Sequence, residues 1–406
     1  MQEERTNVPK IRFKGYAEDW EERKVGDFLK ESKIKGTDGS IAKKLTVKLW
    51  RKGVIAKEEI YSGSSATQYY IRKAGQFMYG KLDFLNQAFG IVPPELDGYE
   101  STLDSPAFDI GKNMNAIFLL EYISLVRFYK YQGTIANGSR KAKRIHVDTF
   151  LEMPLLVPSF KEQQKIGTFF KQLDDTIALH QRKLDLLKQT KKSYLQKMFP
   201  KKGEDKPEIR FAGFTDAWEQ RKLGELGKTQ SGIGFPDAEQ GGSEGIPFFK
   251  VSDMNNIGNE YEMRNANHYV SDEQIERKKW KPIKDVPAII FAKVGAAIML
   301  NRKRLVTSSF LIDNNTMAYM FNNTWDIYFG KILFETINLP RYSQVGALPS
   351  YNSSDIESID VKVPVKDEQQ KIGNFFKQLD DTIALHQREL DSLKEMKKSL
   401  LQQMFV

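Results

Sequence analysis

Cysteine is absent from the 406 residues, and histidine occurs only four times. The first absence excludes disulfide bonds and thiolate metal sites, and the second leaves little material for a metal centre. No stretch approaches the roughly 20 consecutive apolar residues of a membrane-spanning helix. The N-terminal segment is charged where a signal peptide would be apolar. The composition therefore predicts a folded cytoplasmic protein without a membrane segment.

The motifs of enzymes that act on nucleic acids or nucleotides are also missing. An amino-methyltransferase needs an Asp/Asn-Pro-Pro-aromatic loop, but the single Pro-Pro pair lies between Val92 and Glu95. No G-x-x-x-x-G-K-[ST] loop and no strand–G-x-G-x-x-G–helix pattern occurs. Pro236-Asp237 lacks the acid-x-lysine completion of a common nuclease site. We predict no catalytic residue and no metal ligand, and favour a binding protein. A stand-alone methyltransferase or nuclease with a divergent site is the main alternative.

Charge is abundant but unevenly placed along the chain. The 62 Lys and Arg residues exceed the 53 Asp and Glu residues, so the formal charge is +9 and the pI is near 9.2. Residues 1–203 carry a net charge of +12, and residues 204–406 carry −3. A basic balance favours a polyanionic partner such as nucleic acid. The first half should then supply more of the non-specific attraction to phosphates.

Two segments occur twice with little change. Residues 162–199 and 368–405 are identical at 31 of 38 aligned positions. A shorter segment, called the opener below, begins each half. The first opener is PKIRFKGYAEDWEERKVG at 9–26, and the second is PEIRFAGFTDAWEQRKLG at 207–224. The two bodies between these segments have little visible likeness. A repeat of this kind predicts two halves related by a pseudo-two-fold axis.

Each copy of the long repeat has the spacing of a helix with one apolar stripe. Residues at heptad a and d positions predict two helices of ~38 residues, roughly 57 Å long at 1.5 Å per residue. Such a stripe must be buried, and the twin helix is the obvious partner. Because the linker 200–206 is short, the second helix must run back toward the first body, which predicts an antiparallel coiled coil. The expected seam comprises Ile166, Phe170, Leu173, Ile177, His180, Leu184, Leu187, Ile372, Phe376, Leu379, Ile383, His386, Leu390 and Leu393.

Two kinds of polar residue interrupt this seam. Lysines stand at 191 and 397, and histidines at 180 and 386. We interpret the histidines as polar residues that set the register of the pair, and a metal-binding or pH-sensing role is the alternative. The antiparallel arrangement also predicts that the chain end at Val406 lies near the first opener, as Phe199 lies near the second.

The outer faces of the helices are nearly as similar as the seam. Helix pairing alone does not require this, and the two bodies have diverged almost completely. A recent duplication would account for the identity, but it would have left the bodies alike as well. We therefore favour helices whose outer faces bind the same partner twice, while the bodies bind different ligands.

The bodies have mixed α+β patterns. Residues 41–63, 69–92 and 284–300 have the alternation and glycine spacing of strands and turns, whereas 115–133 and 325–343 have helical spacing. Basic clusters interleave with aromatic and small polar residues, which suits contacts to phosphates and base edges. Solvated surface charge on a scaffold that binds no DNA is the alternative. The candidate DNA contacts are Lys43, Lys44, Arg51, Lys52, Tyr69, Arg72, Arg140, Lys141, Lys143, Arg144, Lys293, Asn301, Arg302, Lys303, Arg304, Arg341 and Tyr342.

Taken together, the paired openers and the paired EQQKIG and FFKQLDDTIALHQR helices resemble the specificity subunit of type I restriction–modification systems. The resemblance covers nearly the whole chain. The phrases IPFFKVSDMN (246–255) and IIFAKVGAA (289–297) are also similar to the recognition domains of that family. The first body departs from the family pattern, with YYIRKAGQFMYGKLDF at 69–84, so its contact loops are harder to place.

The resemblance implies an α+β protein with two target-recognition domains joined by the antiparallel helices. The expected boundaries are 1–160 for the first recognition domain, 161–200 for the first helix, 201–366 for the linker and second recognition domain, and 367–406 for the second helix. Each domain would bind one half of a split double-stranded DNA target. Two modification (methyltransferase) subunits would dock on the repeats, and restriction subunits would join them. The chain itself would hold no cofactor, because S-adenosylmethionine, ATP and Mg²⁺ would be bound by those partners.

Overall fold

A computed structural model describes residues 7–58, 63–134, 144–344 and 348–406. The chain divides into two compact units. Unit 1 comprises residues 1–181 and 389–406, and unit 2 comprises residues 182–388. Both boundaries fall inside long helices, so each unit contains one body, the start of one long helix and the end of the other.

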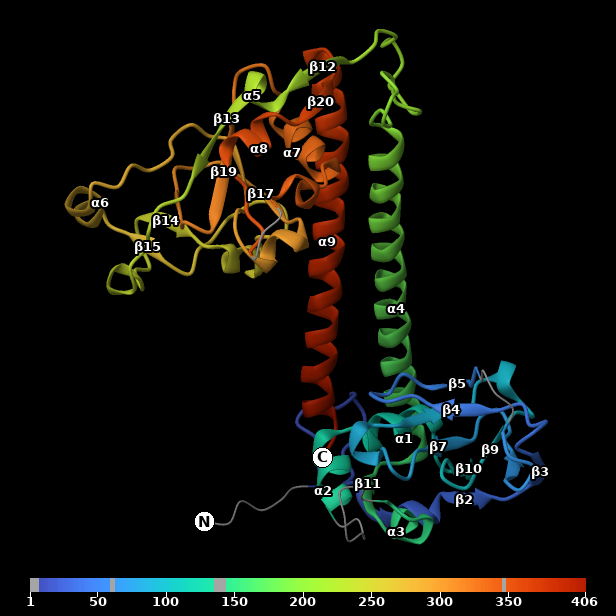
Figure 1. The fold of residues 1–406 in the computed structure, drawn as a ribbon. Coiled ribbons are helices and arrows are strands. Elements are labelled where there is room, and N and C mark those ends of the chain that lie inside the picture. The colour runs from blue at the N-terminus through green and yellow to red at the C-terminus, as the bar shows by residue number, and fades with distance from the viewer. Residues whose placement is uncertain (1–6, 59–62, 135–143, 345–347) are drawn as a thin grey trace. The chain divides into compact units, whose positions relative to one another are not determined.

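The long helices are α4 (Phe160–Lys197) and α9 (Lys366–Met404), green and red in Figure 1. Neither run contains proline, and both are rich in leucine, lysine and glutamine, which favour helix. Each helix begins one residue before the boundary expected from the sequence. None of the helices in the described ranges has both the length and the apolar character needed to cross a bilayer.

Within unit 1, the start of α4 and the end of α9 pair in opposite directions. The rings of Phe170 and Phe405 lie 5.8 Å apart. One helical turn further along α4, Asp174 lies 2.5 Å from Lys397. His180 Nδ1 then lies 3.5 Å from the carboxylate of Glu389. Because the α9 partner moves toward lower numbers as α4 advances, the pairing is antiparallel, as predicted.

The same direction holds within unit 2. Tyr194 packs edge-on against Phe375 at 5.0 Å, and Lys191 lies 2.8 Å from Asp380. Lys188 Nζ donates to Gln387 at 3.4 Å.

All residues of the predicted seam are buried or half-buried, and none is exposed.

Each opener packs against the end of the long helix that comes from the other half of the sequence. In unit 1 the Ile11 amide donates to the Gln403 carbonyl at 2.9 Å, and the Trp20 ring packs on Phe405. In unit 2 the Ile209 amide donates to the Lys197 carbonyl at 2.8 Å, and Trp218 packs on Phe199. The C-terminal end of the chain therefore lies beside the first opener, as predicted.

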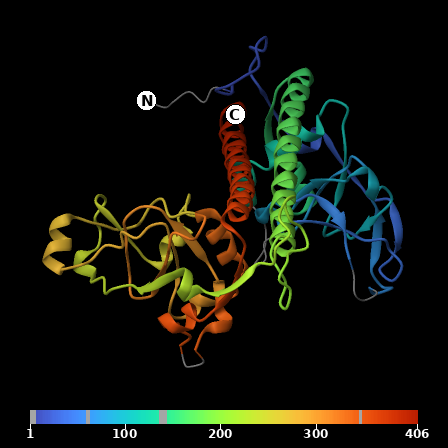
Figure 2. The same ribbon diagram turned by 90° about the horizontal axis from the view of Figure 1, so that it is seen from above.

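The body of unit 1 is built from short strands and helices, drawn in blue to green in Figures 1 and 2. Its strands are β1 (Glu21–Lys24), β2 (Leu29–Ser32), β3 (Lys35–Asp38), β4 (Leu45–Val47), β5 (Val54–Ala56), β6 (Gln68–Ile71), β7 (Phe77–Tyr79), β8 (Phe89–Ile91), β9 (Glu100–Ser101), β10 (Ala107–Ile110) and β11 (Pro154–Val157). Its helices are α1 (Ala116–Ile123), α2 (Val126–Thr134) and α3 (Val147–Leu151), with 3₁₀ turns η1 (Val25–Asp27), η2 (Phe84–Asn86) and η3 (Pro94–Leu96).

The body of unit 2 has a similar content. Its strands are β12 (Glu219–Lys222), β13 (Gly227–Ser231), β14 (Ile246–Phe249), β15 (Tyr269–Val270), β16 (Ala288–Ala292), β17 (Lys303–Val306), β18 (Leu311–Ile312), β19 (Thr316–Phe321) and β20 (Asp360–Val363). Its helices are α5 (Leu223–Leu226), α6 (Asp272–Lys278), α7 (Ile327–Thr336) and α8 (Ser353–Glu357), with 3₁₀ turns η4 (Asp237–Glu239), η5 (Val251–Asn255), η6 (Ala296–Leu300) and η7 (Leu339–Tyr342).

Both bodies contain the same antiparallel sheet although their sequences look unrelated. The strand order is β2-β10-β7-β8 in unit 1 and β13-β19-β16-β17 in unit 2. In both, the last two strands are joined through a 3₁₀ turn, η2 or η6, that ends on a residue in the left-handed region, Gln87 or Asn301. Each unit also has a separate two-stranded ribbon, β1-β11 or β12-β20, formed by the opener and the strand before the long helix.

One apolar core in each unit joins the body to the helix pair. In unit 1, Trp20, Phe118 and Phe170 are buried together with Phe405. In unit 2, Trp218, Phe329 and Phe376 are buried together with Phe199. Because each core includes residues from both long helices, the helices are part of the folded units and not free connectors.

Candidate functional site

The openers are tied to the long helices by a forked ion pair that occurs once in each unit. Arg12 donates through Nε and Nη2 to the two oxygens of Glu162 at 2.7 and 2.8 Å. Arg210 makes the same two bonds to Glu368, again at 2.7 and 2.8 Å. Both glutamates are fully buried in the first turn of a helix, where the helix dipole favours negative charge. The hydrogen bonds to the glutamates raise the pKa of both arginines.

The next repeated residue, glutamine, bridges the long helix to the body. In unit 1, Gln163 accepts from the Asn115 amide at 3.0 Å and donates to the Pro158 carbonyl. In unit 2, Gln369 accepts from the Asp326 amide at 2.9 Å and donates to the Pro364 carbonyl. The bridged residues, Asn115 and Asp326, are the N-caps of α1 and α7. These bonds orient the short body helix against the start of the long one.

Packing explains why each EQQKIG run ends on a glycine. A Cβ at Gly167 would lie 2.2 Å from the Asn115 side-chain oxygen, and a Cβ at Gly373 would lie 2.3 Å from that of Asp326. Only glycine permits these approaches without a shift of the neighbouring cap. Several identities outside the seam are therefore explained by contacts within each unit.

A quartet of charges joins the body to the helices in unit 1. It comprises Lys397 from α9, Asp174 from α4, and Arg51 and Glu121 from the body. Lys397 Nζ lies 2.5 Å from Asp174 and 3.1 Å from Glu121. Arg51 donates to both oxygens of Glu121, which is fully buried. The quartet is neutral, because two cations face two carboxylates.

Unit 2 has a quartet of the same composition. Lys191 Nζ lies 2.6 Å from Glu335 and 2.8 Å from Asp380. Lys331 Nζ lies 2.5 Å from Asp380 and 3.5 Å from Glu335. The α4 lysine and the α9 aspartate are the repeat counterparts of the helix members in unit 1. The body members, both from α7, stand at positions that do not correspond to those in unit 1.

Electrostatics favours the charged forms in both quartets. Burial alone would raise the pKa of Glu121, but Arg51 and Lys397 outweigh burial and hold that pKa below its usual value. Burial alone would lower the pKa of Lys191, but Glu335 and Asp380 outweigh burial and raise it. The quartets thus explain the lysines that interrupt the predicted seam. The acidic partners were not predicted from the sequence, although a lysine on an apolar seam is itself a signal of a buried acidic partner.

Some repeated side chains on the long helices point to solvent. Leu179 and its counterpart Leu385 are 59% and 48% exposed. Lys171 pairs with Asp175 one turn along α4 at 2.6 Å, and Lys377 pairs with Asp381 along α9 at 2.9 Å. Exposed pairs of this kind contribute little to stability. Folding therefore accounts poorly for the identity of these side chains in the two copies.

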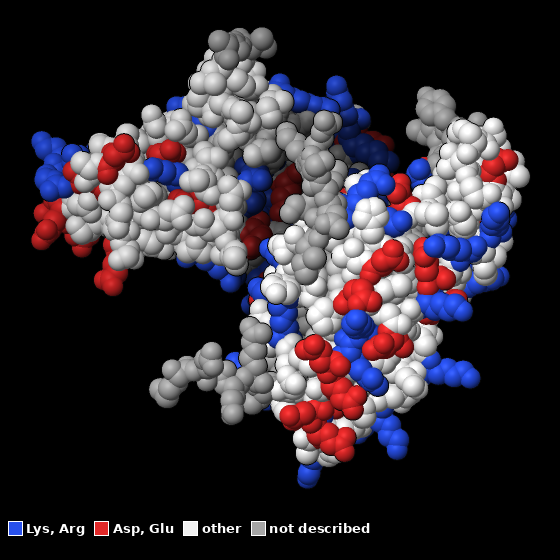
Figure 3. All heavy atoms as spheres, turned by 90° about the horizontal axis from the view of Figure 1, so that it is seen from below, with Lys and Arg blue, Asp and Glu red and all other residues white. Residues whose placement is uncertain are grey.

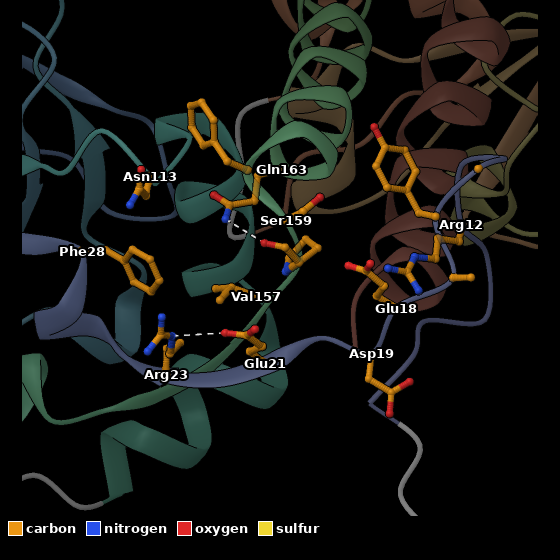
Figure 4. Close-up of a pocket in the computed structure, with 15 residues that line it drawn as sticks. Arg12, Glu18, Asp19, Glu21, Arg23, Phe28, Asn113, Val157, Ser159 and Gln163 are labelled. Atoms are coloured by element: carbon orange, nitrogen blue, oxygen red, sulfur yellow. Dashed lines mark hydrogen bonds and ion pairs between the residues drawn. The ribbon is translucent and has the colours of Figure 1, made fainter.

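A cavity of about 610 Å³ lies beside the ribbon of unit 1 (Figure 4). Glu21 and Arg23 of β1 line it together with Phe28, Val157 and Gln163. A cavity of about 300 Å³ occupies the matching place in unit 2, where its lining includes the β12 residues at 219 and 221. Both cavities are lined by side chains of the opener, of the strand before the long helix and of the helix itself.

The predicted DNA contacts of the first body lie in several different environments. Lys43 and Lys52 are exposed. Lys44 is buried, with Nζ 5.4 Å from the ring centre of half-buried Tyr69. Arg51 belongs to the unit 1 quartet and is half-buried.

Arg72 is fully buried and donates to the Ser32 carbonyl and the Ser101 hydroxyl, and burial lowers its pKa to about 10. Its guanidinium is therefore committed inside the body. Arg144 is exposed and pairs with Asp104 at 3.0 Å. The remaining predictions in this body, Arg140, Lys141 and Lys143, lie outside the described residues.

The run of predicted contacts at 301–304 in the second body forms bonds within unit 2. Asn301 accepts from the Leu339 amide at 3.1 Å, and Arg302 donates to the Asn255 side chain. Lys303 Nζ is buried and donates to the Ile337 carbonyl at 2.6 Å, and burial lowers its pKa to about 8.

Arg304 donates to the Asn259 carbonyl at 2.5 Å, and burial lowers its pKa. Lys293 is half-buried. Arg341 and Tyr342, which are exposed, belong to η7. Among the predicted contacts that the structure describes, Lys43, Lys52, Arg144, Arg341 and Tyr342 are thus the ones most open to a ligand.

Charge of both signs covers the visible face of the unit 1 body. In Figure 3 the Lys and Arg side chains are interspersed with Asp and Glu over this body. The net positive charge of the first half is therefore not gathered into one basic patch on this face.

Comparison with known proteins supports one family. A family model described as the type I restriction modification DNA specificity domain matches residues 106–189 and 215–395, more than half of the chain. The MjaVIII type I restriction enzyme specificity subunit of Methanocaldococcus jannaschii is 22% identical over 439 residues, covering 95% of this chain and 91% of that protein. The MjaIX specificity subunit of the same organism is 24% identical over 286 residues, covering 67% of this chain. The chain spans 64% of the MjaIX protein and 65% of the MjaX specificity subunit, just under two thirds of each.

Solved structures share the fold. The type I restriction–modification S subunit from M. genitalium gives a TM-score of 0.62 at 13% identity and covers 98% of this chain and 99% of its own. A chain from a study of complex assembly and conformational transition of the type I R-M system gives 0.54 at 13% identity, covering 95% of this chain and 97% of its own. The family match, together with the repeated helices and paired bodies, shows that this chain belongs to the type I restriction–modification DNA specificity family, whose members are the non-catalytic specificity subunits.

Proposed function

We propose that each body binds one half of a bipartite double-stranded DNA target and that the long helices set the spacing between the halves. The repeated surfaces of the helices dock two modification (methyltransferase) subunits, and restriction subunits complete the assembly. S-adenosylmethionine is held by the modification subunits, and ATP and Mg²⁺ are likewise held by partner subunits. The complex works in the cytoplasm.

One observation supports this proposal above the others. The forked ion pair, the glutamine bridge and the glycine approach occur twice at equivalent places, yet they hold two bodies of unlike sequence. Identical contacts that hold two unlike bodies suit a protein whose two recognition domains can each be exchanged. A scaffold that binds a single ligand would not need two different bodies held by identical contacts.

Replacing residues 27–158 with the corresponding body of another specificity subunit is expected to change only one half of the target. The exchange leaves the repeat side of the holding contacts in place, and an unlike body can supply the other side, as Asp326 does for Gln369 in unit 2. The base contacts come from the body. Genome methylation mapping of cells that carry the parent or the exchanged chain measures the result. The other half-site and the spacer length serve as internal controls. A change in both half-sites would contradict the modular assignment, and a motif unaffected by removal of the gene would contradict the function.

A chain whose ends are joined and which is reopened between residues 200 and 206 is expected to fold and keep its DNA target. The Ile11–Gln403 hydrogen bond places the two ends of unit 1 together, and the Ile209–Lys197 bond would hold the new ends in unit 2. Retention of target and non-target duplexes by the assembled complex measures the outcome. Loss of specific retention by a permuted chain that folds would count against the proposed arrangement.

A further inference from the structure

We propose that the two cavities beside the ribbons β1-β11 and β12-β20 are docking pockets, and that each receives the same short segment of a modification subunit. This inference rests on the proposed function, which supplies a partner present in two copies. It adds a second contact for that partner, separate from the exposed outer faces of α4 and α9.

The first observation is that the cavities are repeat counterparts of each other. The opener contributes a glutamate and an arginine to each, the strand before the long helix ends on a lining valine that is followed by a lining proline, and the helix contributes a glutamine. An apolar side chain, Phe28 or Leu226, completes the wall. The identical pairs that the argument uses are Glu21 and Glu219, Arg23 and Arg221, and Val157 and Val363.

The second observation is that folding does not explain the charged pair at each cavity. The side chains of Glu21 and Glu219 are 74% and 75% exposed, and those of Arg23 and Arg221 are 53% and 40% exposed. The contact between arginine and glutamate is 3.4 Å in unit 1 and 3.6 Å in unit 2, and exposed pairs contribute little stability. The buried members of the opener have clear intramolecular partners. Arg221 also pairs with Glu225 at 2.6 Å, but this pair is exposed as well and adds little to the stability of the unit.

The third observation concerns what the cavities can accept. Figure 4 shows Phe28, Val157 and Arg23 close together around one space next to the first turn of α4. Phe28 and Val157 offer apolar surface to a side chain, and charged groups of the same segment can pair with the arginine and with Glu21. The smaller cavity, about 300 Å³, limits the shared ligand to a short segment.

The charges at the first cavity also argue against DNA as the occupant. Glu18, Asp19 and Glu21 line it, and their carboxylates would repel a phosphate backbone. Arg12, the other basic residue in the lining besides Arg23, is already committed to Glu162. A protein segment with charges of both signs suits this lining better than a polyanion.

The test is assembly with the purified modification subunit, followed by native mass spectrometry and a titration of affinity. The full-length wild-type chain is expected to take up two modification subunits. Arg23→Glu and Arg221→Glu are each expected to weaken uptake of one copy by roughly tenfold or more, and the double variant to weaken both. Lys14→Glu is the matched control, because Lys14 is exposed on the same opener, lies outside the cavity lining and corresponds to Ala212 in the second copy.

The outcomes separate this inference from the proposed function. If the wild-type chain takes up no modification subunit, the proposed function fails and the docking pockets fail with it. If wild type and both arginine variants take up two copies with equal affinity, the pockets are refuted while the proposed function stands. Hydrogen exchange of the wild-type chain gives a readout that does not depend on the variants. Residues 21–24 and 219–222 should both be protected in the complex, and no protection at either ribbon would overturn the inference.

Discussion

Asp380→Asn is expected to destabilise unit 2 by about 3–5 kcal/mol, the cost of breaking a buried charge pair on one side. The Asp380 side chain is 7% exposed and contacts Lys191 and Lys331, at 2.8 and 2.5 Å. Without its charge, two ammonium groups that are 10% and 8% exposed would share the single carboxylate of Glu335. The free energy of unfolding in urea, followed by a probe in unit 2, measures the change.

The duplicated sequence supplies the control for this prediction. Asp174 is the repeat counterpart of Asp380, in the same QLDD run, but its side chain is 42% exposed. Asp174→Asn should therefore cost about 1 kcal/mol or less, because water already screens the Asp174 carboxylate and Lys397 keeps its contact with Glu121 at 3.1 Å. Equal effects of the two substitutions would show that burial of the quartet does not govern its contribution.

Arg210→Met is expected to cost about 3–5 kcal/mol and to release the second opener from α9. The substitution leaves the fully buried carboxylate of Glu368 without its two charge-assisted hydrogen bonds, and the first turn of the helix compensates only in part. Unfolding in urea measures the loss. Hydrogen exchange at residues 207–222 shows whether the opener has separated.

Arg210→Lys distinguishes charge from fork geometry. Lysine keeps the positive charge but cannot present two parallel donors to one carboxylate, so we expect an intermediate loss. Arg12 makes the same fork with the same two distances, so Arg12→Met should reproduce the effect in unit 1. An Arg210→Met chain with unchanged stability and unchanged exchange at the opener would refute a structural role for the fork.

The helices and their direction could be predicted because the signals are local and repeated. The seven-residue spacing of apolar side chains specifies a helix with one buried face, and the short linker leaves one direction for the return. The lysines at 191 and 397 could not be explained in this way. Their partners include Glu121 and Glu335, which stand at unrelated positions in the two bodies and meet the lysines only after folding.

The DNA-contact predictions show where sequence reasoning is weakest. A cluster of basic residues in the sequence does not reveal which of its side chains face solvent. Arg72 and Lys303 are buried and bonded to backbone carbonyls, whereas Lys43 and Arg341 are exposed. All four side chains are cationic, and the packing around them decides which of them face solvent.

The internal repeat, the two long helices, their antiparallel direction and the family could all be recognised from the order of the residues. Repetition and heptad spacing can be recognised from the order of residues along the chain, so they need no coordinates. The folded chain was needed to show that the unlike bodies share one sheet order, that each long helix ends against the opener of the other half, and that the repeated charges meet in quartets and forks. These features depend on contacts between residues that are separated in the sequence, by 158 positions for Arg210 and Glu368, and no local pattern records which distant side chain will be the partner.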